Sequence, residues 1–241
     1  MRRALLIFGL LAWSVGFAAN RAGAQTDAYS ELPPAPGAAG ASGSSVSLGA
    51  QQVDGVAARI EDDIITESEV RELGAFQQLV DGKSKSRVEI LRELGDQWMI
   101  RNEATTAKYA QPSSPDVDRA YAEFVKQFPS AEDFKRRCAG AGLSEAAVRR
   151  MVQQQLYLAR FIDYRFRPAA QVTDQQVADY YRDELVPQLK TRNADVPPLD
   201  DVDDTIREVL IQRAINDRAN KFLEENRGRL KIDIVSKEGG S

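Results

Sequence analysis

The sequence contains no histidine among its 241 residues and only one cysteine, Cys138. Without imidazole the chain lacks the base of Ser/His/Asp and Cys/His nucleophile systems, and it has no side chain whose unperturbed pKa lies near neutrality. Glycine-rich phosphate-binding loops and paired cysteines are also missing, so we expect no nucleotide, metal or other cofactor. These absences favour a binding protein over an enzyme.

The single cysteine excludes an internal disulfide bond. Cys138 lies four residues after Phe134 on a predicted helix, and a free cysteine in an apolar position usually behaves as a small core residue. We therefore expect Cys138 to be buried, and the alternative of a reactive thiol is less favoured.

The N-terminus has the pattern of a secretory leader. Arg2 and Arg3 precede an apolar run over residues 4–19, and small residues at 22–24 form a cleavage signal. We expect a signal peptide cleaved after Ala24, with the membrane contacted only through that peptide. A retained membrane anchor is the alternative, but the run is shorter than the roughly 20 apolar residues that a span needs.

The composition after the leader separates a tether from a folded domain. Residues 25–52 are mostly Ala, Gly, Ser and Pro, and they contain too few bulky apolar groups to offset the entropy of ordering. We predict a disordered tether there, a folded domain over residues 53–235 and a short tail over 236–241. The net charge is −4, and it becomes −7 without the three arginines of the leader. This acidic balance argues against nucleic acid as a partner.

The domain is predicted to be mainly α, because apolar residues recur at helical spacing through most of it. Capping patterns mark several helix starts, such as Thr66 with Glu69 and Thr173 with Gln176. Helices are predicted over residues 66–80, 86–109, 114–128, 130–138 and 144–167, with a short helix from 173 and a last long helix that ends at Gly228. Residues 188–204 are polar and contain two prolines, so they are predicted to be a linker.

A small β element is predicted from the two ends of the domain. Residues 56–60 and 64–65 surround a polar turn, as in a hairpin. Residues 230–234 alternate apolar and polar side chains, as in a half-buried strand. We expect this C-terminal strand to pair with the hairpin and tie the ends of the domain together.

These segments, in this order, resemble the SurA-type periplasmic chaperones. The resemblance is carried by VAARIEDDIITESEV from Val56, then LGDQWMIRNEA, SSPDVDRAYAEF, GLSEAAVRRMVQQQLYLARFI and VTDQQVADYY. It covers about residues 53–182, and the terminal LKIDIV is similar to the closing strand of the family. The family implies an irregular multi-helix chaperone module in the periplasm. Its parvulin prolyl-isomerase domains, which use histidines, have no counterpart here, because residues 188–204 alone occupy their place.

The resemblance and the composition together predict an ATP-independent holdase, a chaperone that binds unfolded chains without catalysis. Its expected clients are unfolded or extended polypeptides, in particular outer-membrane proteins in transit. The aromatic residues expected to line an apolar peptide-binding groove are Phe128, Tyr157, Phe161, Tyr164 and Tyr180. The alternatives are a structural protein that docks one dedicated envelope partner and, less favoured, a prolyl isomerase.

Overall fold

The computed structural model describes residues 54–235. The predicted leader, the tether, Val53 and the tail over 236–241 lie outside the described residues. Between Asp54 and Val235 the chain is mostly helical and contains one small three-stranded sheet. The prediction of a mainly α fold with a small β element is therefore confirmed.

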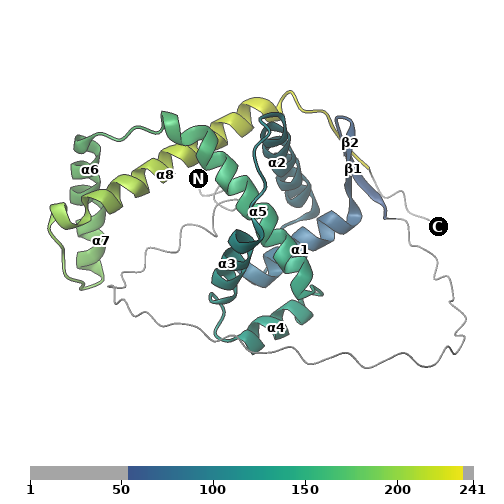
Figure 1. Cartoon of the computed structure of the whole chain (residues 1–241), viewed down its shortest axis with the longest axis horizontal. Helices are drawn as coiled ribbons and strands as arrows, with labels where there is room; N and C mark the ends of the chain where they lie inside the picture. Colours follow the sequence, from purple (N-terminus) through teal and green to yellow (C-terminus); the bar gives the residue numbers. More distant parts are fainter. Residues whose placement is uncertain (1–53, 236–241) are drawn as a thin grey trace, which may run out of the picture.

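The sheet joins the two ends of the domain. Strands β1 (Val56–Ile60) and β2 (Asp63–Thr66) form an antiparallel hairpin, and β3 (Ile232–Ile234) pairs antiparallel with the other side of β1. The strand order is β2-β1-β3, so β2 and β3 are the edge strands. Figure 1 shows the hairpin and the C-terminal strand together at one end of the molecule.

Side-chain caps fix where the first two helices begin. Helix α1 (Glu67–Asp81) starts at the capping box of Thr66 and Glu69, and Gly82 ends it in the left-handed region with φ 71°. Helix α2 (Arg87–Thr106) starts at a second capping box, formed by Ser86 and Glu89. Each box satisfies backbone N–H groups that the first helical turn cannot pair.

Helix α5 is the centre of the larger part of the molecule, which we call the body. The body contains the sheet, α1, α2, α3 (Ser114–Val125), α4 (Ala131–Gly140), α5 (Glu145–Phe166) and the C-terminal half of α8. Helix α5 contacts α2, α3 and α8, so it is covered on several sides. A 3₁₀ turn (Arg167–Ala169) ends it and leads out of the body.

A second part, the small lobe, lies at the other end of the molecule (Figure 1). It consists of α6 (Asp174–Tyr180), a π-helical turn η2 (Tyr181–Leu185), α7 (Val186–Thr191) and the start of α8 (Leu199–Arg227). Pro187 explains the π turn, because it lacks the N–H for a normal helical bond and its ring crowds the preceding turn. The lobe has its own core around Val177, Val202 and Ile206.

The predicted linker over residues 188–204 is wrong in extent. Residues 188–191 belong to α7 and residues 199–204 to α8, which leaves only 192–198 as a connection. Prolines and acidic residues led to the error. Pro198 stands at the N-cap of α8, outside the helix, and the acidic residues that follow it favour a helix start through the helix dipole.

Helix α8 connects the two parts because it contributes to both cores. Ile206 lies in the small lobe, whereas Ile215 and Leu223 lie in the core of the body. Between them, Arg213 forms a two-point ion pair with Glu184, at 2.8 and 2.9 Å, and its guanidinium lies 4.8 Å from the ring centroid of Tyr180. These contacts fasten the small lobe to α8.

Candidate functional site

The structure does not bring the five predicted aromatic residues into one groove. Tyr157 and Phe161 are core residues, with exposed fractions of 4% and 1%. Their assignment to a peptide-binding groove is wrong. Helix α5 carries apolar residues on more than one face because α2, α3 and α8 all pack on it, and not because one face is left open.

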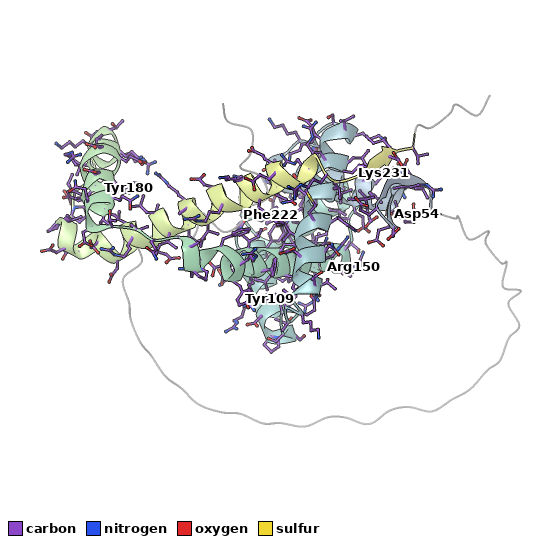
Figure 2. All side chains as sticks on the ribbon, turned by 90° about the horizontal axis from the view of Figure 1, so that it is seen from above. Asp54, Tyr109, Arg150, Tyr180, Phe222 and Lys231 are labelled. Atoms are coloured by element: carbon purple, nitrogen blue, oxygen red, sulfur yellow. The ribbon has the colours of Figure 1, made fainter. Side chains whose placement is uncertain are left out.

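Phe128 and Tyr180 pack against other hydrophobic clusters. Phe128 is half-buried against Phe134 and Phe124, with centroid separations of 5.1 and 5.5 Å. Tyr180 is in the small lobe beneath Arg213. Figure 2 shows Tyr180 at one end of the molecule and Tyr109, which marks the aromatic core of the body, well away from it.

Tyr164 is the only one of the five with a mainly exposed side chain, at 61%. Its ring lies 5.2 Å from that of Tyr109 and 6.4 Å from that of Phe161, so it stands on the outside of an aromatic core cluster. It is accessible, but it is a single exposed ring and not the wall of a groove.

A different surface combines apolar character with a concave shape. It is a hollow of about 60 Å³ beside strand β2, which we call the β2 hollow. Residues from β2, α1, α2 and α5 line it, and they are Ile64, Ile65, Glu69, Glu72, Leu73, Leu94, Gln97, Arg101, Met151 and Gln154.

Helical spacing explains why these residues converge. Leu94, Gln97 and Arg101 are separated by three and four positions, so they share one face of α2. Met151 and Gln154 share one face of α5 for the same reason. The hollow thus has one wall from each helix, and β2 closes its side.

The β2 hollow follows the outer edge of the strand. Ile64 and Ile65 both line it, although successive side chains of a strand point to opposite faces. Lining by both residues places the hollow beside β2, which is an edge strand of the sheet. This edge has no neighbouring strand among the described residues, and Ile64 leaves 53% of its surface exposed there, whereas Ile65 is 4% exposed.

The acidic side chains of the hollow are already engaged. Glu69 accepts hydrogen bonds from the backbone N–H and the hydroxyl of Thr66, at 2.7 and 3.0 Å. Glu72 pairs with Arg150 of α5, which Figure 2 labels, at 3.3 Å. Both carboxylates therefore act in holding the walls of the hollow together.

The remaining polar groups of the hollow are less engaged. Gln97 is 8% exposed, and within residues 54–235 its side chain forms a single hydrogen bond, in which Gln154 Nε2 donates to Gln97 Oε1 at 3.5 Å. Arg101 is exposed, and its guanidinium forms no ion pair with the described part of the chain. Amide and guanidinium donors thus border an apolar floor.

Sequence reasoning placed Leu94 and Met151 in the core and did not identify this hollow. Two signals were present. Ile64 and Ile65 are adjacent apolar residues in a strand that can bury only one of them, and Gln97 and Gln154 interrupt otherwise apolar helix faces. Neither signal reveals that β2, α1, α2 and α5 meet, because that depends on how the helices pack.

No protein-family model matches the chain, and no curated protein matches it significantly. Among the helices between Asp54 and Val235, none has the length and the apolar character needed to cross a bilayer. The same residues contain no group of three or more His, Cys, Asp or Glu side chains placed to hold a metal ion.

Proposed function

We propose that this chain is a SurA-type, ATP-independent holdase that acts in the periplasm on unfolded exported proteins, including outer-membrane proteins. The observation that carries the proposal is the β2 hollow, a depression of mixed polar and apolar lining beside the edge strand β2. The order of the elements, from the hairpin through capped helices to a closing strand, adds the resemblance to that class of chaperone.

A strand edge suits clients that share no sequence. Extended chains add to an exposed edge through main-chain hydrogen bonds, which every sequence offers, while neighbouring depressions take alternate side chains. The hollow is small, so it provides a weak and reversible contact of the kind that a holdase needs. The acidic net charge of the exported chain keeps it soluble while apolar surface is exposed.

The test is light scattering from a urea-unfolded outer-membrane barrel protein diluted into buffer without nucleotide. We expect the chain from Gln25 to Ser241 to suppress scattering at near-stoichiometric amounts. Ile64→Asp places a charge at the hollow and should remove most of the suppression. Val88→Asp is the matched control, because Val88 is 57% exposed, lies outside the hollow, and sits in the first turn of α2, where an acid is tolerated.

Two results would contradict the proposal. One is aggregation that proceeds equally with and without the chain. The other is equal loss of activity in both variants, because it would separate any holdase activity from the β2 hollow. Circular dichroism of the two variants establishes that each retains its helical fold.

A further inference from the structure

We propose that the β2 hollow binds the carboxyl terminus of an extended polypeptide whose last residue is apolar. This inference rests on the proposed function, since it names which part of a client the hollow takes. The occupant is identified by the charge and the hydrogen-bond donors of the lining residues.

The charge of the hollow favours an anion. Its two carboxylates are committed, Glu69 to the cap of α1 and Glu72 to Arg150. Arg101 is the remaining charged group of the lining, and its guanidinium is free of ion pairs among residues 54–235. A guanidinium in this state offers paired N–H donors in the planar arrangement that a carboxylate accepts.

The amide groups add neutral donors beside that charge. Gln154 donates to Gln97 Oε1, so the Gln97 Nε2 group is left with N–H donors and no acceptor among the described residues. Gln97 lines the hollow, so a ligand oxygen bound there can accept a hydrogen bond from this amide group. A carboxylate that bridges Arg101 and Gln97 satisfies both groups.

The apolar lining residues and the size of the hollow indicate which side chain the last residue of the bound polypeptide carries. Ile65, Leu73 and Met151 are apolar lining residues, and the volume of about 60 Å³ accommodates part of one aliphatic or aromatic side chain. Strand β2, which borders the hollow, has no partner on its outer edge among residues 54–235, so it offers main-chain partners to the residues that precede the terminus.

The experiment compares two synthetic peptides that differ only at the carboxyl terminus. Both are N-acetylated, fluorescently labelled decapeptides of alternating apolar and polar residues that end in leucine, one with a free carboxylate and one with a carboxamide. Fluorescence anisotropy with the chain from Gln25 to Ser241 should show roughly tenfold tighter binding of the free acid, the effect of about 1.4 kcal/mol.

Variants assign the preference to the hollow. Arg101→Gln should abolish the preference for the acid, so that the variant binds the acid and the amide with equal affinity. Arg92→Gln is the control, because Arg92 is an exposed arginine of the same helix outside the hollow, and it should retain the preference. Added salt should reduce the preference in the native chain and have no effect in Arg101→Gln.

Each contrary result has a distinct meaning. Equal affinities for acid and amide, a preference that survives Arg101→Gln, or no binding of either peptide overturns the inference. Light scattering in parallel shows whether the holdase proposal stands. If the chain suppresses aggregation but binds both peptides equally, it is a holdase that does not recognise carboxyl termini. If the chain does not suppress aggregation, the proposed function itself is overturned.

Discussion

The guanidinium of Arg227, the last residue of α8, forms a two-point ion pair with the carboxylate of Asp96 in the middle of α2. Arg227 Nε lies 2.8 Å from Asp96 Oδ1 and Arg227 Nη2 lies 2.5 Å from Oδ2, although 131 positions separate the two residues. The Asp96 side chain is only 7% exposed, whereas that of Arg227 is 40% exposed. The pair holds the end of α8 in place where the chain turns toward β3.

Removing the arginine should destabilise the body. Arg227→Met leaves the Asp96 carboxylate buried without its partner, which we expect to cost about 2 kcal/mol in the free energy of unfolding, less than a fully buried pair because Arg227 reaches solvent. Urea denaturation measures the change. Arg182→Met breaks exposed pairs with Asp179 and Asp183 and should cost less than Arg227→Met. Equal losses would show that the Arg227 pair contributes no more than a surface contact.

Gly95 allows β3 to pack on α2. A Cβ atom at Gly95 would lie 3.1 Å from Ile232 Cδ1, so Gly95→Val should push Ile232 away from the helix and cost about 1 to 3 kcal/mol. Hydrogen exchange should accelerate at β3 more than in α6. Gly140→Val, at the end of α4 where nothing lies within 4 Å, is the comparison. Unchanged exchange at β3 in Gly95→Val would exclude this packing role.

Truncation of the aromatic residue Phe161 should destabilise the protein far more than truncation of Tyr164. Phe161→Ala opens a cavity in the core and should cost about 3 to 5 kcal/mol. Tyr164→Ala removes a mostly exposed ring that retains one side against Tyr109, and should cost about 1 kcal/mol or less. Urea midpoints of the two variants check the difference. A costly Tyr164→Ala would mean that the ring is covered in solution.

Cys138 should be slow to react with thiol reagents. Burial raises the pKa of its thiol, and the nearby Glu145 carboxylate raises it further, so less thiolate is present at pH 8 than in the unfolded chain. We expect alkylation by iodoacetamide in the native state to be on the order of tenfold or more slower than in urea. Equal rates in the two states would contradict the burial of Cys138 at 2% exposure.

Asp116 should make the α3–α5 contact sensitive to acid. Hydrogen bonds from Arg160, Ser113 and Arg119 hold the pKa of its carboxyl well below the usual range. A lowered pKa contributes stability above the unfolded-state value near 3.9, and this stability is lost as the pH falls through the lower folded-state pKa.

Thermal unfolding of Asp116→Asn tests this. The variant should melt below the native chain at pH 7, and the gap should begin to narrow below about pH 4, where the unfolded chain takes up a proton that the native Asp116 carboxylate does not. Asp118→Asn, which alters a carboxylate that is 63% exposed, should show a smaller gap. A difference in melting temperature that does not change with pH would show that the charge of Asp116 does not cause the stabilisation.

Local signals in the sequence were enough to predict the elements of the fold. The capping boxes at Thr66 and Thr173 begin helices where expected, and the alternation after Leu230 produced the strand that pairs with β1. Such signals are local because a cap or an alternating strand depends on a few neighbouring residues. The linker predicted over residues 188–204 was too long, because a proline just before a helix cannot be distinguished by sequence from a proline in a loop.

The candidate site was beyond prediction for a physical reason. Whether Tyr157 or Phe161 faces a client or the core depends on how many helices cover α5, and periodicity along one helix does not give that number. Ile64 became informative only when the strand order showed β2 at an edge. The packing of the helices and the sheet determines which residues line the hollow, and it brings together residues as distant in sequence as Ile64 and Gln154.

The pairing of β3 with β1 also fixes when the domain can be completed. Glu61 in the hairpin turn exchanges hydrogen bonds with Lys231, which lies 170 positions later. During synthesis or export, the N-terminal part of the chain appears first. One edge of β1 then has no partner strand until almost the whole domain has followed. Strand β3 therefore pairs only after the rest of the domain has been made. A product truncated before β3 keeps an unpaired, aggregation-prone edge on β1.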